Sequence, residues 1–255
     1  MSELQETFIS HLIELRDRVL RALIAVGIAF LPCFFFARDL YTLLATPLIA
    51  KLPAGSQMIA TDVTGAFFVP MKVAMMVSFL VALPFVLYQV WAFVAPGLYQ
   101  HEKKLAMPLI VTSTLLFFLG MAFAYFAVFP MVFKFVVGYT PEGVAMMTDI
   151  NSYLSFVMTL FMAFGVTFET PVAVIILVRM GIVTVEKLRE IRPYVVVGAF
   201  IIGAVFTPPD IISQFMLAVP IWILYEVGIV LASMMNKSKA TEVQESSAPG
   251  IVEKP

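Results

Sequence analysis

Long apolar segments separated by short polar ones dominate the pattern of this chain. A bilayer core of about 30 Å requires about 20 helical residues, because each residue advances a helix by about 1.5 Å. The apolar runs predict an all-α, polytopic membrane protein with six transmembrane helices. The fifth is short, and Glu226 interrupts the sixth, which we also expect to be short. The predicted spans are approximately Val19–Phe36, Phe67–Val94, Leu105–Phe129, Tyr153–Val178, Tyr194–Phe206 and Ile211–Leu231.

Segments outside these runs complete the predicted domain organisation. Residues 1–18 are apolar at every third or fourth position, which predicts a cytoplasmic amphipathic helix that continues into the first span. Leucines between positions 40 and 48, interrupted by Pro47, predict a short amphipathic helix on the outer surface. Residues 19–235 form the membrane domain, and residues 236–255, polar and without periodicity, are expected to be a disordered cytoplasmic tail.

Prolines occur inside or near the ends of several predicted spans. Because neighbouring helices can satisfy the carbonyl groups that a proline leaves free, we expect kinks rather than breaks. Kinked helices favour a curved, cup-like bundle. The positions are Pro84, Pro108, Pro171 and Pro220.

The lysines and arginines separate into two groups over alternating loops. Short cytoplasmic loops retain positive charge, so the richer side is predicted to face the cytoplasm. Of the sixteen cations, twelve lie on the side of both termini and four on the other, which supports six spans with both ends inside. The smaller group consists of Arg38, Lys51, Lys72 and Lys134.

Composition excludes several classes of protein. Apolar residues make up 61% of the chain and charged residues 13%, so lipid is the expected surroundings of most of it. The net charge of -1 offers no basic footprint for nucleic acid. The single cysteine, Cys33, has no disulfide partner and is expected to pack in an apolar run. The amino terminus lacks the pattern of a cleaved signal peptide, so we expect the first span to be retained.

Motifs for catalysis are missing from the sequence. It contains no G-x-S-x-G elbow, no H-E-x-x-H and no phosphate-binding loop, and His11 and His101 lie outside the spans. We therefore expect no catalytic residues, no metal and no cofactor. Any work done by the protein must draw on a partner or on the membrane potential.

Two carboxylates lie in apolar runs, where an acidic group costs about 2.5 to 3.5 kcal/mol on insertion scales. Glu169 is expected to face an interior or a wet cavity. It is either a neutral acid hydrogen-bonded to a neighbouring helix or a group that handles a substrate or partner. Glu226 lies nearer the cytoplasmic end. There, an interfacial or inter-helix polar contact is as good an interpretation as a role in handling a substrate or partner.

Other polar and aromatic candidates have simple structural interpretations when each is taken alone. Glu14 and Glu102 are expected at the cytoplasmic surface, where a carboxylate is usually solvated. Asp210 follows two prolines and precedes the sixth span, as a helix N-cap does. Phe93 falls at a membrane interface, where aromatic residues are common.

Several strings in fixed order give the chain a resemblance to the TatC family. They are His-Leu-Ile-Glu-Leu-Arg at 11–16, Tyr-Gln-Val-Trp-Ala-Phe-Val-Ala-Pro-Gly-Leu-Tyr at 88–99 followed by His101 and Glu102, Phe-Glu-Thr-Pro at 168–171, Arg-Pro-Tyr at 192–194 and Phe-Thr-Pro-Pro-Asp at 206–210. The resemblance covers about residues 7 to 231, and the combination is highly specific. The family's six spans with both ends inside agree with the topology predicted from hydropathy and charge.

The resemblance implies a receptor for twin-arginine signal peptides in the bacterial cytoplasmic membrane. It would work with TatA and TatB, within a larger complex holding several copies, to export folded proteins using the protonmotive force. Arginine presents a planar fork that a carboxylate accepts bidentately, so adjacent arginines suit more than one acid. On the family's pattern Glu102 is the principal acceptor.

The resemblance also implies roles for other residues. Glu14 supports Glu102, with Arg16 in the same binding segment and Phe93 shaping the apolar surroundings. Glu169 lines the concave face along which the signal's apolar segment inserts. Gln214 and Thr207 mark the edge of spans five and six where TatA or TatB docks.

Two alternatives remain open from the residues alone. A proton-coupled small-molecule carrier could use Glu169 and Glu226 as titrating groups, although the two halves show no matched broken helices of the kind common in carriers. A passive scaffold for other membrane proteins would tolerate neutralisation of Glu14, Glu102 and Glu169.

Overall fold

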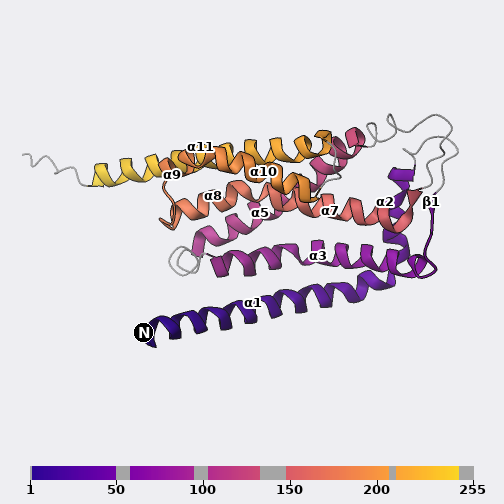
Figure 1. Cartoon of the computed structure of the whole chain (residues 1–255). Helices are drawn as coiled ribbons and strands as arrows, with labels where there is room; N and C mark the ends of the chain where they lie inside the picture. Colours follow the sequence, from indigo (N-terminus) through magenta and orange to yellow (C-terminus); the bar gives the residue numbers. More distant parts are fainter. Residues whose placement is uncertain (1, 50–57, 95–102, 133–147, 207–210, 247–255) are drawn as a thin grey trace, which may run out of the picture. The chain divides into compact units, whose positions relative to one another are not determined.

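The computed structural model describes residues 2–49, 58–94, 103–132, 148–206 and 211–246. Nearly all of these residues are helical (Figure 1), as the sequence predicts. The chain divides into two compact units, an N-terminal unit, Met1–Gly165, and a C-terminal unit, Val166–Pro255.

Long helices build the N-terminal unit. The unit also contains a parallel pair of two-residue strands, in which Met58 is opposite Thr148 and Ile59 is opposite Asp149. The elements are α1 (Ser2–Phe35), α2 (Ala37–Ile49), β1 (Met58–Ile59), α3 (Gly65–Val94), α5 (Lys103–Phe123), η1 (Ala124–Val128), β2 (Thr148–Asp149) and α7 (Ile150–Phe168).

The membrane spans follow the predicted apolar runs closely. Among the described residues, five helical segments are long and apolar enough to cross a bilayer, and Arg192–Phe206 is a shorter apolar helix. The short fifth span is therefore confirmed. The five longer segments are Ile9–Phe35, Gly65–Val94, Met107–Val132, Ile150–Arg179 and Gln214–Met235.

The last helix begins at Ile211, as predicted, but differs from the prediction in two ways. The prediction that the sixth span is short was wrong, because α11 (Ile211–Ser246) passes through Glu226 without a break. The helix also continues through Asn236 to Ser246, into the segment predicted to be disordered. Lys, Ala, Glu and Gln are strong helix formers, so a helix can continue there without an apolar face.

Prolines lie inside helices rather than ending them. α3 continues through Pro70 and Pro84, in agreement with the expectation that proline does not break a span. α2 is the helix predicted in the first external loop. It continues past Pro47 to Ile49, so the predicted interruption was wrong. A proline so close to a helix end removes only one backbone hydrogen bond.

The third span contains a turn of π-helix that the sequence does not reveal. η1 directly follows α5, and the chain remains helical to Val132. A π-turn inserts a residue into the helical repeat and rotates the face that follows it. Ala124 and Val128 are buried here, while Phe126 is 74% exposed.

Close packing of small and large side chains holds the N-terminal unit together. Val69 and Val73 of α3 form a core cluster with Leu154 of α7, and leucines of α2 pack against it. Gly165 allows a second close approach, because a Cβ there would lie 2.5 Å from ring carbons of Phe117. α7 can therefore approach α5 only with glycine at this position.

Hydrogen bonds to one carboxylate join two segments of this unit that are distant in sequence. Asp149 accepts bonds from the amide and hydroxyl of Ser152 and from the hydroxyl of Thr61 at 2.8 Å. The Ser152 amide and the Thr61 hydroxyl hold the pKa of Asp149 well below its usual range. The contact joins the segment before α3 to the start of α7.

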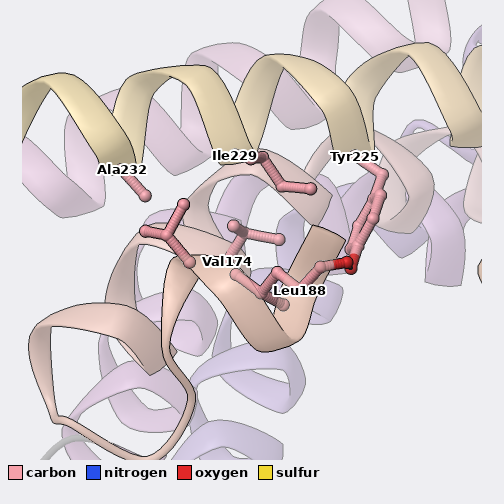
Figure 2. Packing of buried hydrophobic residues seen from close by; sticks show 6 residues of the cluster. Val174, Leu188, Tyr225, Ile229 and Ala232 are labelled. Atoms are coloured by element: carbon pink, nitrogen blue, oxygen red, sulfur yellow. The ribbon is translucent and has the colours of Figure 1, made fainter. Parts of the chain in front are cut away.

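The C-terminal unit has its own core, which Figure 2 shows from close by. Val174 and Leu188 pack against Tyr225, Ile229 and Ala232 on one face of α11. The Tyr225 hydroxyl donates a hydrogen bond to the Leu188 carbonyl at 2.8 Å, so the buried phenol is satisfied. The remaining elements are α8 (Thr170–Arg179), α9 (Val185–Glu190) and α10 (Arg192–Phe206).

Candidate functional site

A group of polar residues in the N-terminal half of α1 lies against the last turns of α3. The two helices run side by side in Figure 1, and residues 11–18 of α1 contact residues 89–93 of α3. His11, Glu14 and Arg18 are spaced by three and four residues, so they lie on one face of α1. We call His11, Glu14, Arg18, Gln89 and Phe93 the α1–α3 cluster.

Two aromatic rings stack at one side of this cluster. The ring centroids of His11 and Phe93 are 4.4 Å apart, with an angle of 18° between the ring planes. The side chain of His11 is 51% exposed. One face of the imidazole therefore rests on Phe93 while the other side of the histidine remains accessible.

Glu14 lies between His11 and Arg18 on the same helix. Its Oε1 accepts hydrogen bonds from Nε and Nη2 of Arg18 at 2.9 and 2.6 Å. Its Oε2 lies 3.9 Å from Nδ1 of His11, which is beyond hydrogen-bond distance. Arg18 also reaches the buried Gln89 of α3, with 3.5 Å between Nη1 and Oε1. The two oxygens of Glu14 therefore have different surroundings.

The part of α3 that carries Phe93 is held in place by α5. The indole Nε1 of Trp91 donates a hydrogen bond to the Ser113 hydroxyl at 2.9 Å. Trp91 is 7% exposed and Ser113 is fully buried. A buried, satisfied polar contact of this kind fixes the relative register of two helices.

Other residues predicted for signal binding lie apart from this cluster or outside the described residues. Arg16 donates from Nε and Nη2 to the carboxylate of its neighbour Asp17, at 3.0 and 2.8 Å. The two side chains are 68% and 45% exposed, and the role of Arg16 in signal binding stays a prediction. Glu102 lies outside the described residues, as do Thr207 and Asp210.

Glu169 lies where α7 ends and α8 begins. Its backbone carbonyl accepts the first helical hydrogen bond of α8, from the amide of Ala173 at 2.9 Å. Both carboxylate oxygens are inaccessible to solvent. The position agrees with the expectation that an acid in this apolar run turns away from lipid, while its role stays a prediction.

Glu226 forms an ion pair with α10. Its Oε2 accepts a hydrogen bond from Nη2 of Arg192 at 2.6 Å, and the side chains are 26% and 43% exposed. Of the two interpretations left open by the sequence, the inter-helix contact is therefore present. Because the pair is partly exposed, it links α10 to α11 without carrying a large stabilisation.

Gln214 also connects α10 and α11. Its amide Nε2 donates to the Phe200 carbonyl at 2.9 Å. A Cβ on Gly203 would lie 3.0 Å from Gln214, so the two helices meet closely here. The side chain predicted to face a docking partner thus has a bond within its own unit, and docking remains a prediction.

The family resemblance named Phe93 beside Glu14, but sequence reasoning missed Gln89 and the stack of His11 on Phe93. The spacing of His11, Glu14 and Arg18 is visible in the sequence and indicates one helix face. Apart from the resemblance, which selects Phe93, no pattern in the sequence places residues of the second span opposite that face. Three or more His, Cys, Asp or Glu side chains do not gather into a metal site anywhere in the part of the chain that the structure describes.

Comparison with known proteins gives consistent matches along most of the chain. The family described as Sec-independent protein translocase protein (TatC) matches residues 10–220. The TatC protein of Escherichia coli K12 is 57% identical over 224 residues, which are 88% of this chain and 87% of that protein. The TatC protein of Azotobacter chroococcum mcd 1 is 56% identical over 228 residues, 89% of each chain.

A solved structure is similar to this chain in both fold and sequence. The crystal structure of a twin-arginine translocase receptor, TatC, superposes with a TM-score of 0.77 at 38% identity, covering 88% of this chain and 98% of that one. The membrane-spanning helices and the sequence matches lead to the same assignment. This chain belongs to the TatC family of Sec-independent protein translocase proteins.

Proposed function

We propose that this chain is the receptor subunit of a twin-arginine translocation system and that it binds the signal peptides of folded proteins at the α1–α3 cluster. The observation that carries the proposal is the position of Glu14. Its carboxylate lies beside a stacked pair of rings at the end of two helices, where a cationic and partly apolar peptide can reach it. The solved relative described as a translocase receptor supports the same function.

The chemistry of the cluster suits arginine. A guanidinium can donate to a carboxylate and lie flat against an aromatic ring at the same time. Glu14 supplies the carboxylate, and His11 with Phe93 supplies the rings. Glu102, which follows α3 and immediately precedes Lys103 at the start of α5, supplies the second carboxylate for the adjacent arginine.

The proposal includes orientation and partners. The end of α1 and α3 that carries the cluster also carries Arg16, Arg18 and Arg21, so it faces the cytoplasm with both termini. TatA and TatB complete the translocase, and α10 with α11 provides the edge where they dock. The family resemblance implies that the protonmotive force drives transport, and the sequence contains no motif for nucleotide hydrolysis by the chain itself.

Export in a strain lacking its own TatC tests the proposal. The unaltered chain should restore export of a folded twin-arginine substrate, while Glu102→Gln should abolish both export and signal crosslinking at normal protein abundance. The reason is that a neutral amide cannot accept a charge-assisted bidentate contact from a guanidinium.

Normal signal crosslinking to the Glu102→Gln variant would count against the receptor. Substrate-dependent proton uptake by the purified chain in vesicles would instead favour the carrier. Normal export after neutralisation of Glu14, Glu102 and Glu169 together would favour the scaffold.

A further inference from the structure

We infer that His11 is a recognition residue that distinguishes arginine from lysine, by offering a flat ring beside the Oε2 atom of Glu14. The inference rests on the proposed function and assigns a half-site for one guanidinium of the signal. Three observations lead to it: the ring stack, the unequal surroundings of the two Glu14 oxygens, and the exposure of His11.

The first observation concerns the ring. Phe93 supports the imidazole from behind at a centroid distance of 4.4 Å, and the histidine side chain is 51% exposed. A planar group held from one side presents its other face in a fixed orientation. Arginine stacks on such faces, whereas the compact and strongly hydrated ammonium of lysine gains less from them.

The second observation concerns the carboxylate. Arg18 uses two N–H groups on Oε1 of Glu14 and extends toward the buried Gln89, so the carboxylate is held on that side. Among the described residues, Oε2 accepts no hydrogen bond, and it lies 3.9 Å from Nδ1 of His11. The open acceptor is therefore at the edge of the exposed ring.

Together these positions form a half-site. A guanidinium lying over the exposed face of His11 can turn its N–H groups toward Oε2 of Glu14, while Arg18 stays on Oε1. Lysine can also satisfy Oε2, but it gains less from the ring. His11 therefore increases the selectivity for arginine over lysine more than it increases the affinity for positive charge in general.

Binding of two signal peptides to the full chain in complex with TatA and TatB tests the inference. One fluorescent peptide carries the arginine pair and the other carries two lysines in the same places. The measured quantity is the ratio of their Kd values in detergent solution at fixed salt. His11→Ala should raise the Kd of the arginine peptide about two- to fivefold, the size of an exposed cation–π contact, and raise that of the lysine peptide less.

Substitutions at the same position separate the flat ring from other properties of histidine. His11→Phe should keep the ratio of the unaltered chain, because it retains a ring against Phe93. His11→Leu should behave as His11→Ala, because it fills the space without a π face. The matched control is Ile13→Ala, which removes an exposed side chain about 200° around α1 from His11 and should change neither Kd.

Several outcomes would overturn the inference. An unchanged ratio in His11→Ala, an equal loss for both peptides, or a His11→Phe variant as defective as His11→Ala would each do so while leaving the receptor intact. Failure of the unaltered complex to bind the arginine peptide would overturn the proposed function itself, and this inference with it.

Discussion

Glu14 illustrates how one side chain can be structural and available for binding at once. The spacing to Arg18 is that of an ordinary helical ion pair, worth about 0.3 to 0.5 kcal/mol. Since Arg18 donates to Oε1 of Glu14 and not to Oε2, the pair orients the carboxylate and leaves Oε2 for a ligand. Taken alone, Glu14 is predicted to be a solvated surface acid, and its neighbours on α3 are what support the proposed role in binding.

Glu14→Gln should weaken binding of a twin-arginine peptide about fivefold and reduce its dependence on salt. The estimate corresponds to about 1 kcal/mol, the upper range for a partly exposed ion pair. Titration of the peptide against the complex at several salt concentrations measures both effects. Arg21→Gln is the charge-altering control on the same helix. Equal affinity and equal salt dependence for Glu14→Gln and the unaltered complex would remove Glu14 from the site.

At the scale of elements, close helix packing places the cluster and depends on small residues that hydropathy does not highlight. Gly165 lets α7 approach Phe117 of α5, and Trp91 fixes α3 to α5 through Ser113. These contacts fix α5 against both α3 and α7. They therefore determine where Phe93 lies even though none of them touches a ligand.

Gly165→Ala should destabilise the protein by about 1 to 3 kcal/mol, because the added methyl group overlaps the Phe117 ring. Thermal unfolding in detergent should show a lower Tm. Gly198→Ala is the matched control, since a Cβ there meets no atom within 4 Å. A second substitution, Phe117→Leu, should recover part of the loss. Equal Tm values for the two alanine variants would show that α5 and α7 are not packed as described.

At the scale of the whole molecule, the sequence predicts the spans well because lipid makes hydropathy the dominant signal. The five long apolar segments and the short α10 were all visible in it. The partnership of Glu226 with Arg192 was not, and an acid taken alone predicts a shortened sixth span that α11 does not have. The π-turn of η1 was equally hidden, since it changes helix geometry without changing hydropathy.

The site was predictable only in part, because helix packing determines which side chains meet there. Periodicity places His11, Glu14 and Arg18 on one face of α1, and the family resemblance selects Glu14 and Phe93. The stack of His11 on Phe93 and the contact of Arg18 with Gln89 join residues more than 70 positions apart, so helix packing determines them. Glu102 stays a prediction because it lies outside the described residues.

Photocrosslinking tests the central claim most directly. A signal peptide with a photoreactive residue beside its arginine pair is irradiated with membranes that contain the full translocase, and the crosslinked positions are identified by mass spectrometry. We expect crosslinks at residues 11–18 and 89–102, and fewer of them when the arginines are replaced by lysines. Crosslinks confined to α10 and α11, or unchanged by the replacement, would contradict a receptor that reads arginine at the α1–α3 cluster.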